Sequence, residues 1–146
     1  MKPEENISII ERYLEQPYWI IDVLPKQVPA AYGEQYFKVE KYYLSHPQID
    51  DICRKFANVL IILSCYDEIT IVLTTEEEIA NPNPEIIERL ISEREPLFVI
   101  LKSADAMISV SGEDTYLTLY NPGAELLDLV HDLATANGLF VWKPRS

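Results

Sequence analysis

Glycine is scarce in this chain, and its scarcity excludes the common phosphate-binding loops. The sequence of 146 residues contains four glycines, at positions 33, 112, 123 and 138, and no two of them are close together. Dinucleotide- and nucleotide-binding loops need several glycines in one turn, because the backbone must approach the phosphate groups closely. The sequence therefore predicts neither a Rossmann-type site nor a P-loop.

Histidine and cysteine are also scarce. The two histidines, His46 and His131, lie far apart, and the two cysteines, Cys53 and Cys65, form no Cys-x-x-Cys pair. A zinc site needs three or four ligands at defined spacing, and a serine hydrolase of the common type needs a Gly-x-Ser-x-Gly turn. The acidic residues also lack the spacing of a calcium-binding EF-hand loop. We expect no metal, no cofactor and two free thiols.

Basic residues are outnumbered and unevenly placed. The chain has 12 Lys and Arg against 24 Asp and Glu, which gives a net charge of −12. No Lys or Arg occurs between Lys55 and Arg89, or between Lys102 and Lys143. A nucleic-acid-binding protein or a protein that binds an anionic membrane surface needs a basic patch, so both classes are disfavoured. A strongly acidic surface suits a basic protein partner.

Long hydrophobic runs are missing as well. The longest apolar stretch, Val59–Leu63, is far shorter than the ~18 residues that indicate a membrane-spanning helix. The first residues, Met-Lys-Pro-Glu-Glu-Asn, lack the order of a signal peptide, and we expect a cytoplasmic location. A hydrophobic content of 48% over this length predicts one globular domain covering residues 1–146.

Periodicity and helix-breaking residues predict alternating helices and strands. We expect a helix from Pro3 to about Gln16, a buried strand over residues 18–24, and a loop over residues 25–34. Residues 35–44 favour a helix, with a strand left open, and residues 48–64 carry a long helical stripe. Strands are expected at residues 69–73 and 97–101. A hairpin is expected from residues 107–111 and 115–120 around Gly-Glu-Asp.

Two segments of the second half resemble each other. Asn81-Pro-Asn-Pro-Glu-Ile-Ile-Glu88 reads against Asn121-Pro-Gly-Ala-Glu-Leu-Leu-Asp128, and each is followed by Leu-Phe-Val, at residues 97–99 and 139–141. Asn83-Pro84 is expected to start one helix and Asn121-Pro122 to cap the other, which Asn137-Gly138 then ends. This predicts a strand–helix–strand unit used twice, at residues 69–101 and 115–142, with both helices on one face of the sheet.

Together these elements predict an α+β or α/β fold. We expect a single domain with a mixed β-sheet of about five or six strands, helices packed on it, and a possible internal β-α-β repeat.

Aromatic residues are concentrated in the first third of the chain. Eight of the fifteen fall between Tyr13 and Tyr43. Tyrosine and tryptophan suit binding surfaces because they bury much area and keep a polar tip, although packing in the core explains them equally. We predict a partner-binding surface from the aromatic residues around Gly33 and from acids in the stretches without basic residues. Its expected members are Tyr32, Tyr36, Glu76, Glu77, Glu78, Asp128 and Asp132.

In composition, being small, acidic and free of catalytic motifs, the chain resembles bacterial immunity and anti-toxin proteins. The resemblance implies a non-enzymatic protein-binding module or inhibitor that recognises a basic partner. Two alternatives stay open. One is a small-molecule-binding or regulatory domain with a pocket between the two repeat units. The other is an enzyme that acts through carboxylate and tyrosine side chains alone.

Overall fold

The computed structural model describes residues 3–145, with side chains from residue 7 onward. Its centre is one seven-stranded sheet with the strand order β3-β2-β4-β5-β6-β1-β7, in which every pair of neighbours is antiparallel. The strands are β1 (Tyr18–Asp22), β2 (Ile69–Leu73), β3 (Glu78–Ala80), β4 (Leu97–Leu101), β5 (Ala106–Val110), β6 (Tyr116–Tyr120) and β7 (Phe140–Trp142).

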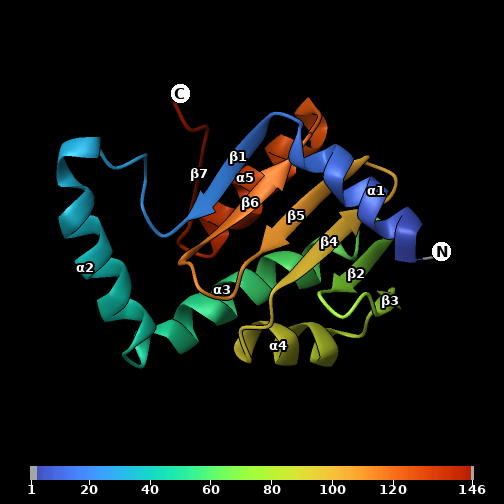
Figure 1. The fold of residues 1–146 in the computed structure, drawn as a ribbon, viewed down its shortest axis with the longest axis horizontal. Coiled ribbons are helices and arrows are strands. Elements are labelled where there is room, and N and C mark those ends of the chain that lie inside the picture. Colours follow the sequence, from blue (N-terminus) through green and yellow to red (C-terminus); the bar gives the residue numbers. More distant parts are fainter. Residues whose placement is uncertain (1–2, 146) are drawn as a thin grey trace.

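Three helices cover one face of this sheet: α3 (Gln48–Leu63), α4 (Pro84–Ser92) and α5 (Ala124–Ala136). In Figure 1, α5 is seen behind the strands, and α3 and α4 lie towards the lower side of the sheet. Alternate strand residues, among them Ile21, Val99 and Leu119, face these helices and are fully buried. The apolar stripe of α3 supplies Phe56, Leu60 and Leu63 to the same core. This layer holds most of the buried apolar surface, which is the main source of stability.

The opposite face of the sheet is covered unevenly. Helix α1 (Pro3–Leu14) crosses it in front of β5 (Figure 1). The phenol of Tyr13, which is 4% exposed, donates a hydrogen bond of 2.7 Å to Asp105 Oδ1 in the turn before β5. Helix α2 (Gly33–Leu44), preceded by the short 3-10 helix η1 (Ala30–Tyr32), stands to the side of the sheet and has no buried residue. A stretch of this face near β1 is therefore free to form a pocket.

The predicted fold class is confirmed as α+β with one sheet, but two details of the sheet were wrong. The sheet is antiparallel throughout and not mixed, and it has seven strands where five or six were expected. The seventh is β3, in a stretch where no strand is expected from the sequence. Its three residues pair with β2 at the sheet edge, across a turn of four residues, so pairing within this hairpin creates a strand that local propensity does not favour.

Most of the predicted helices are confirmed. Residues 35–44 lie in α2, α3 begins and ends within a residue of the expected 48–64, and Asn83 is the N-cap of α4 with Pro84 as its first residue. Gly138 has a φ of 71°, as expected for the end of α5. The N-cap of α5 is Gly123, two residues after the predicted Asn121. The expected hairpin is β5–β6, with strands one residue from the predicted bounds.

The two similar segments adopt matching conformations, although the matching strands differ from those expected. Asn81 and Asn121 both have positive φ, 47° and 59°. Their amides donate 2.8 Å hydrogen bonds to the carbonyls of Ile69 and Pro17, at the starts of β2 and β1. The helix then begins three residues later in each case. Because β2 lies between β3 and β4, and β1 between β6 and β7, the equivalent units are β3-α4-β4 and β6-α5-β7.

The strand that precedes α4 in the unit is thus β3 and not the predicted residues 69–73. Both helices lie on the same face of the sheet, as predicted. Within residues 3–145, no helix is long and apolar enough to cross a membrane.

Candidate functional site

A pocket lies on the sheet face opposite α3, over the pair β1–β6. Its floor consists of three cross-strand pairs, Tyr18 with Tyr120, Ile20 with Thr118, and Asp22 with Tyr116. These residues share a face because successive side chains of a strand point to opposite sides. Their neighbours on the strands, such as Ile21, point into the main core instead.

Segments from both ends of the chain form the walls of this pocket. The end of α1, the loop from Leu24 to Ala30, helix α2 and the segment after β7 all contribute. Two contacts tie the loop to the C-terminal segment. The indole Nε1 of Trp142 donates to the carbonyl of Leu24 at 3.2 Å, and the amide of Arg145 donates to Gln27 Oε1 at 2.6 Å. The cavity volume is about 530 Å³, within the size range of small-molecule sites.

Asp22 is the unusual residue of this pocket. It is the last residue of β1, it is 1% exposed, and it is one of two buried polar residues among those that the structure describes. Its Oδ1 atom is buried without a hydrogen-bond partner, the one such side-chain atom in the described part of the chain. Burying a carboxylate without a partner is costly, so an orphaned oxygen of this kind calls for an explanation.

The environment of Asp22 changes its acidity. Burial is the main cause that raises the pKa of this carboxyl to about 6, and the charge of Glu40 on α2 adds to the increase. The backbone amides of Leu24 and Val23 and the indole of Trp142 act in the opposite direction, because they stabilise the ionised form. A carboxyl group with such a pKa changes its charge within one pH unit or so of neutrality.

Two tyrosines near Asp22 remain neutral phenols. Tyr36 donates a hydrogen bond of 2.9 Å to Glu40 Oε2, and burial together with that carboxylate raises the pKa of Tyr36. Burial raises the pKa of Tyr116 to about 12, assisted by Asp114 and Glu40. These side chains therefore offer aromatic faces and hydroxyl groups to a ligand, without charge.

The predicted partner-binding residues do not form one surface. Tyr36 lines the pocket, while Tyr32 lies at the end of η1 and is 65% exposed. Glu76 and Glu77 lie in the β2–β3 turn and Glu78 is the first residue of β3, at the sheet edge opposite β7. Asp128 and Asp132 are exposed on α5, which covers the other face of the sheet. The structure thus places these acids away from the two tyrosines, and their role in binding stays a prediction.

The other cavities and reactive side chains of the described residues are weaker candidates for a functional site. A second hollow of about 550 Å³ lies near Tyr66, Ala104 and Leu126, and it has no buried unpaired polar atom among the residues described. Within residues 3–145 no three His, Cys, Asp or Glu side chains gather where they could hold a metal ion. Cys53 is buried and Cys65 exposed, and both are free thiols.

Sequence reasoning missed Asp22 and Trp142 as site residues. A signal for Asp22 was present, because it is a charged residue inside the predicted buried strand 18–24. Acids are almost never fully buried unless they are paired, so a carboxylate in such a strand indicates either an edge or a site. Trp142 carries no comparable signal.

Comparison of the chain with protein-family models, with curated proteins and with solved structures gives no match. The residues and geometry of the pocket are therefore the basis for assigning a function.

Proposed function

We propose that this chain is a small-molecule-binding domain whose ligand occupies the pocket over β1 and β6. The observation that carries the proposal is the buried, unpaired Oδ1 of Asp22 among the lining residues of a cavity of about 530 Å³. An apolar cavity with a few polar groups is the usual form of a ligand site. The orphaned oxygen supplies the polar group that fixes the orientation of a ligand.

The alternative explanation, that Asp22 is a structural residue, is less consistent with its contacts. A buried carboxylate that serves the fold is normally paired with a cation or has donors for both oxygens, whereas the amides of Val23 and Leu24 and the indole of Trp142 leave Oδ1 of Asp22 without a partner. Residues of similar size without charge would fill the same position at lower cost. A ligand that binds in the pocket and contacts Oδ1 would offset the free-energy cost of burying this oxygen without a hydrogen-bond partner.

We expect ligands to be detected by NMR titration of the full chain against a library of small organic molecules. Binding should shift the backbone amides of β1 and β6 around Ile20 and Thr118, together with the indole N–H of Trp142. The bulky substitution Thr118→Trp fills the floor of the pocket and should abolish these shifts. Phe98→Trp, which lies on the same face but two strands away on β4 and outside the pocket lining, is the matched control.

Shifts confined to the second hollow, near Tyr66 and Leu126, would contradict this assignment. So would equal effects of the two tryptophan substitutions. Circular dichroism of both variants establishes that a loss of binding does not come from a loss of folding.

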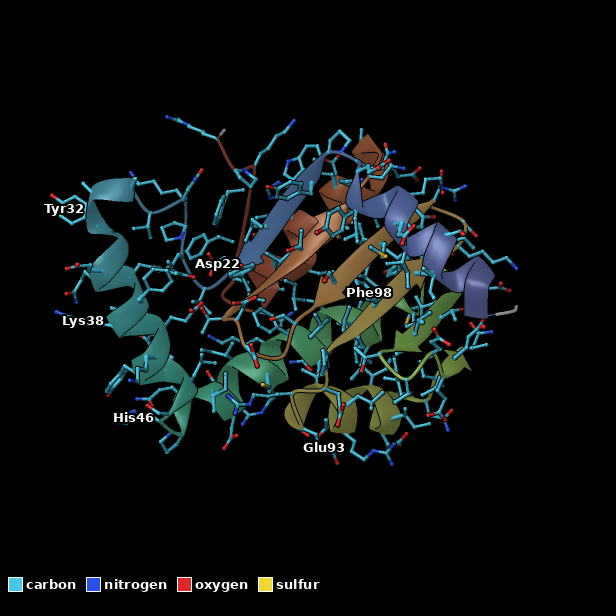
Figure 2. The ribbon with its side chains drawn as sticks, viewed as in Figure 1. Asp22, Tyr32, Lys38, His46, Glu93 and Phe98 are labelled. Carbon is cyan, nitrogen blue, oxygen red and sulfur yellow. The ribbon has the colours of Figure 1, made fainter. Side chains whose placement is uncertain are left out.

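A protein-binding role is a second candidate, and one observation favours it. Tyr32 and Phe37, 65% and 66% exposed, lie on η1 and α2, a segment that has no buried residue and stands to the side of the sheet (Figure 2, which labels Tyr32). Large exposed aromatic side chains are common anchors of interfaces. With a net charge of −12, we propose a basic protein as the partner in this case.

This second candidate predicts a salt-dependent partner. Immobilised wild-type chain should retain a basic protein at low ionic strength and release it as salt screens the charges. The double variant Tyr32→Ala/Phe37→Ala should dissociate faster, and Asp128→Lys/Asp132→Lys should associate more slowly. Retention that is indifferent to salt and to both double variants contradicts the proposal.

A further inference from the structure

We propose that the ligand of this pocket is a small organic amine, bound as its ammonium ion with Asp22 as the counter-ion. The inference rests on the proposed function and adds the chemical class of the ligand. The inference depends on two properties of the residues that line the pocket. They include a carboxylate but no basic residue to balance its charge, and many of them are aromatic.

Asp22 is the one charged side chain among the described residues that line the pocket; none of the others is Lys, Arg or His. No ion pair of Asp22 is found among the residues described, and the nearby Glu40 adds a second negative charge. Lys38, on the same helix as Glu40, lies on the outer side of α2 and away from Asp22 (Figure 2). Among the described residues no cation balances this carboxylate, and a cationic ligand in the pocket would supply that charge.

The remaining lining residues suit a cation with an apolar body. Six aromatic side chains border the cavity: Tyr18, Tyr36, Phe37, Tyr116, Tyr120 and Trp142. The faces of such rings attract an ammonium group, and the attraction increases where water is excluded. Leu14, Ile20 and Val28 add aliphatic surface for the rest of the molecule.

The same residues disfavour other ligand classes. A phosphate, a carboxylate or a zwitterionic amino acid would bring an anion into a pocket that offers it no cation. A bare metal ion would find one carboxylate, where calcium takes six to eight oxygen ligands. The net charge of −12 also raises the local concentration of cations over anions near the surface.

Three probes of the same shape test the inference. Isothermal titration of the full chain with 2-phenylethylamine, 2-phenylethanol and 3-phenylpropionate compares a cation, a neutral molecule and an anion. At about pH 7.5 we expect the amine to bind about tenfold or more tightly than the alcohol, and the carboxylate not at all. A fourth probe is lysine acetylated at its α-amino group and converted to the N-methylamide at its carboxyl group. Its free ε-ammonium group represents a lysine side chain within a peptide.

Asp22→Asn is the decisive variant and Asp128→Asn its matched control, because both remove one negative charge but Asp128 is exposed on α5. Asp22→Asn should weaken amine binding about tenfold or more and leave the alcohol unchanged, whereas Asp128→Asn should change neither. Tyr120→Leu, which removes one ring of the floor and keeps the carboxylate, should weaken the amine more than the alcohol.

The dependence on pH gives an independent readout. Amine affinity should rise as pH increases from about 5 to about 7.5, because Asp22 ionises in this range, while alcohol affinity should stay constant. The other titratable groups facing Asp22 are Glu40 and Tyr36 on α2 and Tyr116 on β6. Tyr36 and Tyr116 do not ionise in this range because burial raises the pKa of each.

The outcomes separate this inference from the proposed function. If the alcohol or the carboxylate binds in the pocket as tightly as the amine, the pocket is a ligand site but the amine assignment is wrong. If Asp22→Asn retains amine affinity, the assignment is also wrong. If only the lysine derivative binds, the source of the ammonium group is a peptide and not a free amine. If none of the four probes binds, and the NMR titration against the library finds no ligand, both the small-molecule-binding function and the amine assignment are wrong.

Discussion

The variant Asp22→Asn is expected to be more stable than the wild-type protein by about 3 kcal/mol at neutral pH. The pKa of this carboxyl is raised from 3.8 to about 6, mainly by burial. One pKa unit corresponds to about 1.4 kcal/mol of difference between the two protonation states. Asparagine has nearly the same shape, never ionises, and can keep its amide oxygen toward the amides of Val23 and Leu24.

The direction of the pH dependence follows from the raised pKa. The carboxyl binds its proton more tightly in the folded than in the unfolded chain, so its ionisation opposes folding. The wild-type protein loses this contribution to stability as pH rises from about 4 to about 6. The advantage of the asparagine variant is therefore complete above about pH 7 and vanishes below about pH 4.

Urea unfolding followed by tryptophan fluorescence, at both ends of this range, measures the difference. Asp128→Asn is the control, since its exposed carboxylate should alter the free energy of unfolding by less than about 0.5 kcal/mol. A destabilised Asp22→Asn at neutral pH would mean that the carboxylate has a partner within the fold. A stabilised variant that no longer binds amines would show that the site is retained at the expense of stability.

Gly112→Ala is expected to destabilise the protein by at least about 3 kcal/mol, through backbone strain and a direct clash. Gly112 has a φ of +82° in the β5–β6 turn, a conformation that residues with a side chain rarely adopt. A Cβ at this position would lie 2.1 Å from the backbone carbonyl oxygen of Arg94. That oxygen belongs to the α4–β4 connection, so relief of the clash requires two loops to separate.

Gly33→Ala is the matched control. Gly33 begins α2 with a φ of −59°, and no atom lies within 4 Å of an added Cβ. This substitution should change the free energy of unfolding by less than about 1 kcal/mol, and in the stabilising direction. Thermal unfolding should place the Gly112→Ala midpoint about 10 °C or more below that of Gly33→Ala. Midpoints within about 2 °C of each other would contradict the expectation.

Local signals in the sequence predicted a large part of this fold. The spacing of Ile52, Phe56, Leu60 and Leu63 predicted α3, because a helix with one apolar stripe must bury it against the sheet. Asn83-Pro84 predicted the start of α4, and Gly138 the end of α5, because these positions need particular backbone angles that few residues adopt readily.

Two of the strand pairings escaped prediction. The strand β3 exists because Ile79 and its neighbours pair with β2 in a hairpin, and Glu-Ile-Ala, with a single β-branched residue, is too short to indicate a strand on its own. The place of β1 between β6 and β7 depends equally on tertiary contacts. The site also depends on tertiary contacts that the sequence does not reveal. Tyr36 was among the predicted binding residues, but the pocket that it lines is formed by four separate segments of the chain. Only coordinates bring Asp22 beside Tyr36, Tyr116 and Trp142.

The insertion of β1 between β6 and β7 has a consequence for the order of folding. Strands β2 to β6 pair with neighbours that are close in the sequence, whereas β1 must find β6 across most of the chain. Closing so long a loop is entropically costly and slow compared with forming a hairpin. During synthesis β1 leaves the ribosome early, yet its two partners are made last. The pocket, which needs β1, β6 and Trp142 together, is therefore expected to be the final part of the molecule to form.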